Sequence, residues 1–403
     1  MKLGGGLGHL TYCTNIHRGE TWPEVLAALE RNLPKVKAAF APEGTFGVGL
    51  RLSAVAAEAL REPGAFAQLR QLLDAHDLYI FTINGFPYGP FHGVRVKEEV
   101  YQPDWQHEER LIYTDVLADL LADLLPDEPG LEGSVSTVPG TFKPLSTAPG
   151  VVERIAENMV RHAAHLVLLR ARTGRTIALA LEPEPYCFLE TIEETARFFE
   201  QHLFAAAAID RLADLCGLTR GDAEQALHRH LGVCYDVCHA AVEYEDPRGG
   251  LEALRAAGIR VPKLQLSAAL RIAEVDAAKA ERLRSFDEPV YLHQVVERRR
   301  GALARYLDLP QAFAALNGAA VPGEPREWRV HFHVPIFLDE IEHFSTTQDF
   351  LREILAIHRA DPVSAHLEVE TYTWDVLPEQ DRQDDVATAI ARELAWVRNR
   401  LTS

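Results

Sequence analysis

Acidic and imidazole side chains stand at the ends of several short apolar segments of this chain. Glu182 ends residues 177–182, Asp236 ends residues 232–236, and Glu370 ends residues 365–370. Each run is rich in aliphatic or β-branched residues, which predicts a buried parallel strand rather than a helix. Carboxylates and imidazoles are ligands of divalent metal ions, so acids placed at strand ends could hold an ion together with a histidine such as His333.

Strand and helix patterns alternate along most of the 403 residues, which predicts an α/β fold with a parallel sheet. The expected strands are residues 10–14, 47–52, 78–84, 133–138, 177–182, 232–236, 263–267, 329–334 and 365–370. The main expected helices are residues 22–40, 54–60, 65–76, 110–125, 151–172, 192–199, 253–257 and 384–401. In a closed (β/α)8 barrel the carboxyl ends of the strands meet at one mouth, where active sites are built. We therefore expect Glu182, Asp236 and Glu370 to converge there.

The nine expected strands are one more than a (β/α)8 barrel needs. Either one of them is a hairpin or extension at the mouth, or one is misassigned. Residues 268–328, rich in Ala, Arg, Glu and Leu, separate two of the expected strands. We expect a single TIM-barrel domain over residues 1–403, with residues 268–328 inserted as a helical lid or subdomain.

Asp236 and His239 are spaced so that the acid could reach a metal ion while the imidazole contacts substrate or metal from the following loop. Asp236 could equally cap the next helix. Glu182 and Glu184 leave the same face of an extended segment, and burial of such acids is costly unless an ion or hydrogen bonds offset it. Glu182 could also cap a helix or pair with an arginine.

His331 and His333 alternate along an expected strand and therefore share one face, although such a pair is more often structural. Gln265 is a neutral amide and a weaker ligand than histidine or a carboxylate, which favours substrate binding for it. His17 follows the first strand, and Asn84 and His92 delimit a loop rich in Gly, Pro and aromatic residues after the third strand. That composition suits the wall of a small-molecule pocket, and it equally suits a rigid packed loop.

The net charge of −18 argues against a nucleic-acid partner, because an acidic protein repels a phosphate backbone. No apolar stretch is long enough to cross a bilayer and no signal peptide is evident, so we expect a cytoplasmic protein without membrane insertion. The five cysteines lack redox or zinc-finger spacing, which predicts reduced thiols. A small-molecule substrate is the expected partner, and a homo-oligomer stays open.

Glu182, the Asp236-x-x-His239 pair, the His331-x-His333 segment and Glu370 together resemble the xylose isomerase-like TIM barrels. The resemblance implies isomerase or epimerase chemistry with a divalent ion such as manganese, magnesium, cobalt or zinc. It implies Glu182, Asp236, Gln265 or His333, and Glu370 as ligands. Four segments resemble EboE-type metabolite traffic proteins more closely: residues 10–17, 84–92, 291–295 and 367–374.

The leading hypothesis is a metal-dependent isomerase or epimerase of a small sugar-like or carbonyl metabolite, with Glu182 and Glu370 moving a proton and His239 orienting hydroxyl groups. His17, Asn84, His92, Gln265 and His331 are the candidate substrate contacts. The alternative is a non-catalytic metabolite-binding or carrier protein that keeps the barrel pocket. Metal-assisted hydrolysis or lyase chemistry at the same mouth is a third reading.

Overall fold

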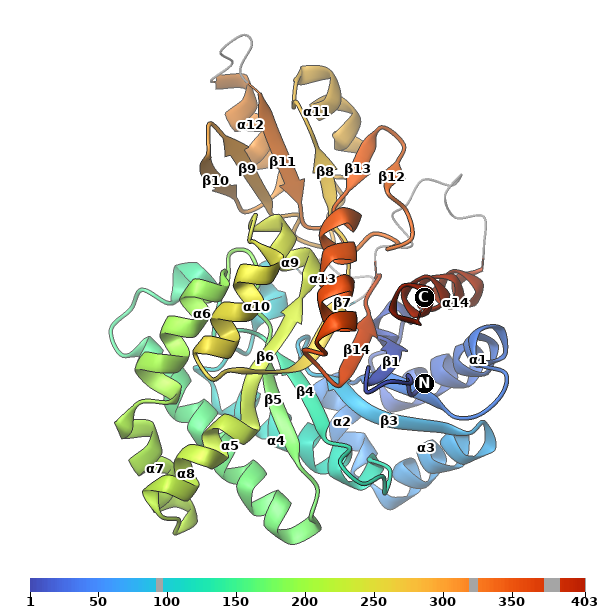
Figure 1. Cartoon of the computed structure of the whole chain (residues 1–403), viewed down its shortest axis with the longest axis vertical. Coiled ribbons are helices and arrows are strands. Elements are labelled where there is room, and N and C mark those ends of the chain that lie inside the picture. Colours follow the sequence, from blue (N-terminus) through green and yellow to red (C-terminus); the bar gives the residue numbers. More distant parts are fainter. Residues whose placement is uncertain (92–96, 319–324, 373–384, 403) are drawn as a thin grey trace.

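A parallel barrel forms the main body of the molecule (Figure 1). The computed structural model describes residues 1–91, 97–318, 325–372 and 385–402. The barrel strands are β1 (His9–Tyr12), β2 (Phe46–Arg51), β3 (Leu78–Asn84), β4 (Gly133–Thr137), β5 (Ile177–Leu181), β6 (Leu231–Asp236), β7 (Arg260–Leu266) and β14 (His366–Val369). They pair in parallel in the order β1-β14-β7-β6-β5-β4-β3-β2. The prediction of a (β/α)8 barrel is confirmed.

The barrel closes between β1 and β2 through a side chain. The Thr11 hydroxyl donates to Gly47 O at 2.7 Å and accepts from Gly49 N at 3.0 Å. A single parallel bridge between Cys13 and Gly49 follows. Thr11 therefore replaces ladder hydrogen bonds that the two strands do not make directly.

Helices cover the outside of the barrel, and most lie where the amphipathic pattern predicts them. They are α1 (Trp22–Phe40), α2 (Ala54–Leu60), α3 (Pro63–Ala75), α4 (Glu108–Leu124), α5 (Val151–Thr173), α6 (Ile192–Phe198), α7 (Ala206–Cys216), α8 (Arg220–His230), α9 (Val237–Val242), α10 (Pro247–Ala256), α13 (Gln348–Ala360) and α14 (Val386–Thr402). Helix α1 begins after Thr21, whose N–H donates to Glu24 Oε2 at 2.9 Å and so satisfies a donor at the helix start. In the described part of the chain, no helix combines the length and apolar character that crossing a bilayer requires.

A second sheet is inserted between β7 and α13, and Figure 1 shows it above the barrel. Its antiparallel strands are β8 (Leu270–Ile272), β9 (Val295–Arg299), β10 (Ala302–Tyr306), β11 (Arg326–Val330), β12 (Glu340–Ile341) and β13 (Phe344–Thr346), in the order β10-β9-β11-β8-β13-β12. The helices α11 (Ala277–Leu283) and α12 (Leu309–Gly318) accompany it. Residues 268–328, which we expected to be a helical lid or subdomain, contain strands as well as the helices α11 and α12, and the last two strands of this sheet, β12 and β13, lie beyond residue 328.

One of the nine expected strands, residues 329–334, is not part of the barrel. Its first residues end β11 of the antiparallel sheet, and His331 and His333 lie in the extended segment after that strand. The apolar residues of this segment correctly predict that it is buried. Burial alone does not show which of the two sheets a strand joins.

A buried ion pair fills the barrel interior below the mouth. Lys263 on β7 contacts Glu368 on β14, and both side chains are fully buried. Gly49 makes room for this pair, because a Cβ at that position would lie 1.7 Å from Glu368 Oε1. Glu370, two residues further along, continues the same face of the chain toward the mouth.

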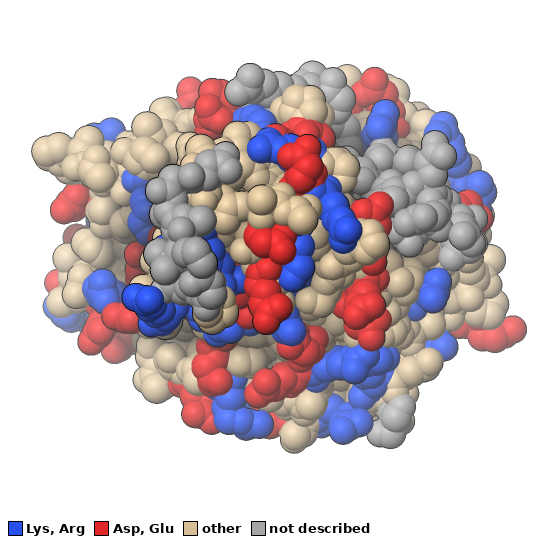
Figure 2. Space-filling view, turned by 90° about the horizontal axis from the view of Figure 1, so that it is seen from above, with Lys and Arg blue, Asp and Glu red and all other residues tan. Residues whose placement is uncertain are grey.

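On the end of the molecule seen from the top of Figure 1, acidic and basic side chains are interspersed (Figure 2). The negative charge of the chain is therefore not gathered into one acidic patch on this face.

Candidate metal centre

Three carboxylates from distant parts of the chain meet at the mouth of the barrel. Glu182 follows β5, Asp236 ends β6 and Glu370 follows β14. One oxygen of each lies within 4.8 Å of the others, and all three residues are buried. The structure thus brings together the acids that stand at strand ends in the sequence.

Backbone pairing fixes two of these acids. Glu182 N donates to Thr137 O, and Glu370 N donates to Leu266 O, each at 3.0 Å. These bonds extend the parallel ladders by one residue past the strands, so the side chains are held by the barrel itself rather than by a loop.

Asp236 serves two purposes. Its Oδ1 accepts from His239 N at 2.9 Å, which caps α9, and from Ser267 Oγ at 2.8 Å. The alternative reading of Asp236 as a helix cap is therefore correct for this oxygen. The other oxygen, Oδ2, has no hydrogen-bond partner among the described residues and is buried.

Two oxygens of this carboxylate group lack the hydrogen bonds that buried acids need, within the described residues. Glu182 Oε2, like Asp236 Oδ2, finds no donor in the described part of the chain. Burial, and then the nearby charges of Glu370 and Asp236, raise the pKa of Glu182 well above its ordinary value. A divalent cation would satisfy these oxygens and offset the repulsion, so the residues fit such an ion.

Two amides hold Glu370. Asn15 Nδ2 donates to Glu370 Oε1 at 2.6 Å, and Asn84 Nδ2 donates to the same oxygen at 3.1 Å. Glu370 Oε1 therefore has two donors, whereas Glu182 Oε2 has none among the described residues. The two glutamates therefore lie in chemically different surroundings although their oxygens are close.

Three histidines lie beside the carboxylates. His239 comes from α9, and His331 and His333 come from the segment after β11. The Nε2 atom of His331 lies 3.1 Å from the Nε2 atom of His239 and 3.1 Å from that of His333. The Nε2 atoms of His239 and His333 are 3.4 Å apart. Burial lowers the pKa of His239 to about 4 and holds the pKa of His331 well below its ordinary value, so both imidazoles are neutral near pH 7.

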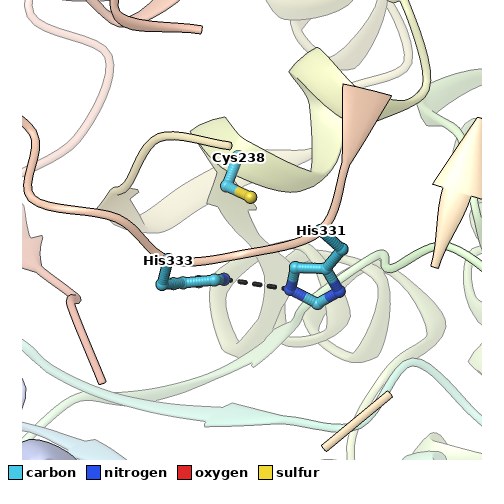
Figure 3. A group of neighbouring side chains, drawn as sticks. All are labelled: Cys238, His331 and His333. Atoms are coloured by element: carbon cyan, nitrogen blue, oxygen red, sulfur yellow. Dashed lines mark hydrogen bonds between the residues drawn. The ribbon is translucent and has the colours of Figure 1, made fainter. Parts of the chain in front are cut away.

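Figure 3 shows His331 and His333 pointing toward each other, with Cys238 of α9 facing them. One nitrogen of each histidine and Cys238 Sγ lie within 4.8 Å of one another. The Cys238 thiol donates to Phe332 O at 3.4 Å, and burial raises the pKa of this thiol well above its ordinary value. Cys238 is therefore a protonated thiol that packs beside the histidines, and it is not in a disulfide.

A cavity of about 60 Å³ opens over this group of side chains. It has room for a few waters, or for an ion and a small polar group. Glu182, Glu370 and the three histidines line it, and Lys97 and Asn15 also reach it. Its apolar and aromatic wall consists of Phe86, Phe91, Val100, Tyr101, Tyr291 and Leu292.

Glu184 is a further buried acid of this cavity that sequence reasoning did not place in the site. Its Oε1 accepts from Tyr101 OH at 2.9 Å and from Gln294 Nε2 at 3.1 Å. Burial raises the pKa of Glu184 to about 8. Its position two residues after Glu182 was a usable signal, because alternate residues of an extended segment share a face. Asn15, Tyr101 and Gln294 carry no such signal.

The remaining expected substrate contacts lie in different places. Asn84 and His331 line the cavity. His17 contacts Tyr12 OH at 2.9 Å and is not among the lining residues. Gln265 is buried in the barrel, in register with Asp236 and Glu368, and does not line the cavity. His92 lies outside the described residues.

Solved structures share this architecture. A xylose isomerase-like TIM barrel protein from Mycobacterium smegmatis, in complex with magnesium, aligns with a TM-score of 0.50 and 12% identity over 98% of this chain and 96% of that chain. A D-tagatose 3-epimerase-like protein aligns with a TM-score of 0.48 and 12% identity over 98% of this chain and 100% of that one. The IolI protein with a bound zinc atom aligns with a TM-score of 0.42 and 13% identity, over 98% of each chain.

Sequence comparison adds nothing to this assignment, because no protein-family model and no curated protein matches the chain. At identities this low the structural similarity shows the fold alone. The protein is a (β/α)8 barrel with the fold of the xylose isomerase-like proteins.

Proposed function

We propose that the protein is a metal-dependent isomerase or epimerase of a small sugar-like or carbonyl metabolite. The observation that carries this proposal is the convergence of Glu182, Asp236 and Glu370 at the barrel mouth, where one buried oxygen of Glu182 and one of Asp236 have no donor in the part of the chain that the structure describes. Manganese, magnesium, cobalt or zinc would suit this donor set, with His333 also in reach because its Nε2 lies 4.0 Å from Asp236 Oδ2. The magnesium complex of the Mycobacterium smegmatis protein supports this choice of ion.

The two glutamates divide the acid–base work. Glu370, held in place by the amides of Asn15 and Asn84, takes a proton from the carbon next to the substrate carbonyl, which leaves an enediolate. Glu182, whose pKa is raised by burial and by the nearby charges of Glu370 and Asp236, gives its proton to the opposite face of the same carbon and so completes an epimerisation. For an isomerisation the proton goes to the neighbouring carbon instead, and the hydroxyl proton moves between the two substrate oxygens. When bound, the divalent ion would stabilise the negative charge on the substrate oxygens.

The finer proposal is a role in metabolite handling like that of EboE-type proteins. Each of the four segments that resemble those proteins contributes to the cavity: Asn15, Asn84 with Phe86, Tyr291 with Leu292, and Glu370 with Tyr372. The resemblance therefore concerns residues that a ligand would contact, which supports a shared ligand-binding role.

Hydrogen exchange with solvent tests the proposal directly. The protein is stripped with a chelator, reloaded with Mn²⁺, and incubated in D₂O with a panel of ketoses and sugar phosphates. We expect one deuterium at the carbon next to the carbonyl group of the true substrate, detected by mass spectrometry. Glu370→Gln should abolish this exchange, because its amide cannot accept the proton.

Glu393→Gln is the matched control, because Glu393 is a buried glutamate that bonds Thr371 Oγ1 and Ile336 N and does not line the cavity. It should leave the exchange rate unchanged. If a metabolite of the panel raises the melting temperature but no deuterium is incorporated, the protein is a binding or carrier protein and the catalytic proposal fails.

A further inference from the structure

The spacing of the three histidines matches a nitrogen-ligated metal site. The separations between the Nε2 atoms of His239, His331 and His333 are 3.1, 3.1 and 3.4 Å. Zinc–imidazole bonds of 2.0–2.1 Å in a tetrahedral site place the ligand nitrogens about 3.3–3.4 Å apart. The three nitrogens thus lie close to three corners of such a tetrahedron before any ion is considered.

The hydrogen-bond partner of Nδ1 shows which nitrogen of each histidine ring carries the proton. His239 Nδ1 lies 2.9 Å from Pro183 O, His331 Nδ1 lies 2.8 Å from Gln294 Oε1, and His333 Nδ1 lies 3.1 Å from Glu370 O. All three oxygens are acceptors, so each Nδ1 is the donor. With Nδ1 as the donor of each ring, Nε2 is the nitrogen that can offer a lone pair to a metal ion, and the three Nε2 atoms lie close together.

The hydrogen bonds of the Gln294 amide orient its oxygen toward His331 Nδ1. Its Nε2 donates to Tyr101 OH at 2.9 Å, to Glu184 Oε1 at 3.1 Å and to Pro185 O at 3.2 Å. These acceptors leave Oε1 to face His331. Outer partners that fix the tautomer and direction of an imidazole are characteristic of metal ligands.

Converging lone pairs repel unless a proton or a metal ion lies between them, and a carboxylate beside them stabilises the positive charge of either. Asp236 Oδ1 lies 3.9 Å from His239 Nε2, and Asp236 Oδ2 lies 4.0 Å from His333 Nε2. Imidazole nitrogen is a softer donor than carboxylate oxygen and suits Zn²⁺ or Co²⁺ better than Mg²⁺.

We propose that His239, His331 and His333 form a second metal site, which takes Zn²⁺. In this arrangement His333 ligates the second ion, and the first ion is held by the carboxylates of Glu182, Asp236 and Glu370. The site goes beyond the proposed isomerase function, which requires only the carboxylate ion. Its fourth coordination position faces the cavity that all three histidines line, where water or a substrate oxygen would bind.

This second ion would join the inserted segment to the barrel. His239 belongs to α9, which follows barrel strand β6, whereas His331 and His333 belong to the insertion between β7 and α13. Zinc binding would therefore hold the insertion over the cavity, and its removal would loosen that contact.

Metal uptake by stripped full-length protein tests the site. The protein is first saturated with Mn²⁺ and then titrated with Co²⁺, with metal content measured by elemental analysis. We expect a second equivalent of metal, a visible Co²⁺ spectrum of tetrahedral nitrogen coordination, and slower backbone amide exchange in residues 326–334. His331→Gln should lose the Co²⁺ spectrum and keep the Mn²⁺ equivalent, while Glu182→Gln should weaken Mn²⁺ binding and keep the spectrum.

Cys238→Ser is the matched control, because Cys238 faces the same histidines but donates its proton to Phe332 O. It should retain the Co²⁺ spectrum, and its loss would move the site to the cysteine and overturn the three-histidine assignment. Wild-type protein that takes up no second equivalent would show that a proton lies between the rings and would also overturn the proposal. Neither result affects the binding of Mn²⁺ by the three carboxylates. The isomerase proposal can therefore fail or hold independently of the second metal site.

Discussion

Replacing Glu182 by glutamine should stabilise the metal-free protein and weaken its response to metal. The three carboxylates lie within 4.8 Å of one another, and burial together with the nearby charges of Glu370 and Asp236 raises the pKa of Glu182. A glutamine has nearly the same shape, carries no charge, and can donate its amide N–H to the neighbouring acids. Without a cation the three acids repel one another. Removing the charge of one acid should therefore make the metal-free folded protein more stable.

The magnitude follows from Coulomb's law and linkage. Two like charges 4.8 Å apart cost about 3 kcal/mol at an effective dielectric constant of about 20. The folded pKa of Glu182 lies above its unfolded value, so the wild type loses stability as pH rises from the unfolded pKa toward the folded one, while the variant does not titrate. We expect the metal-free variant to be more stable than the wild type by roughly 1–3 kcal/mol at pH 8, with a smaller difference at pH 5.

Metal binding should offset most of this difference in stability. At about 100 times its dissociation constant, Mn²⁺ stabilises a one-site protein by about 2.7 kcal/mol. With an unfolding entropy of about 2.1 cal/mol/K per residue over 403 residues, this is a rise of about 3 °C in melting temperature. For Glu182→Gln we expect a rise of about 1 °C or less.

Thermal unfolding with chelator and with Mn²⁺, at pH 5 and pH 8, measures all of these differences. Glu393→Gln serves as the control and should keep the full response to Mn²⁺. The reasoning is refuted if metal-free Glu182→Gln is less stable than the wild type and the Mn²⁺ response of the two proteins is the same.

Three further predictions concern the barrel that holds the site. Lys263→Met should lower the free energy of unfolding in urea by about 3–5 kcal/mol, because it leaves the fully buried Glu368 without its partner. Adding Glu368→Met should restore most of this loss. A Lys263→Met variant as stable as the wild type would contradict the ion pair. Thr11→Val should cost about 1–3 kcal/mol and speed amide exchange at the β1–β2 seam, because two backbone groups lose their partner; unaltered exchange would show that the hydroxyl does not close the barrel. Burial raises the pKa of Glu393 to about 7, so its contribution to stability is complete below the unfolded pKa and is lost as pH rises through about 7. Glu393→Gln should therefore gain roughly 3 kcal/mol relative to the wild type between pH 4.5 and pH 8, and parallel pH profiles of the two melting temperatures would disprove the shift.

Much of the fold could be predicted from the sequence because its signals are local. Short aliphatic runs between amphipathic segments predict buried parallel strands, and eight of the nine expected strands form the barrel. The helices expected at residues 22–40 and 54–60 coincide with α1 and α2. Glu182, Asp236 and Glu370 could be placed at one mouth for the same reason, since the carboxyl ends of parallel barrel strands share one end.

Only the tertiary structure decided the antiparallel sheet and the surroundings of the site. Residues 329–334 read as a buried strand, but whether that strand joins the barrel or a second sheet depends on its hydrogen-bonding neighbours, which an apolar run does not encode. The converging rings of His239, His331 and His333 depend on acceptors from Pro183 and Gln294, which lie far from their partners in the chain. Residue type and spacing showed which side chains could bind a metal. The distances between the histidine nitrogens, and the acceptor that each Nδ1 faces, exist only once the insertion is packed against the barrel.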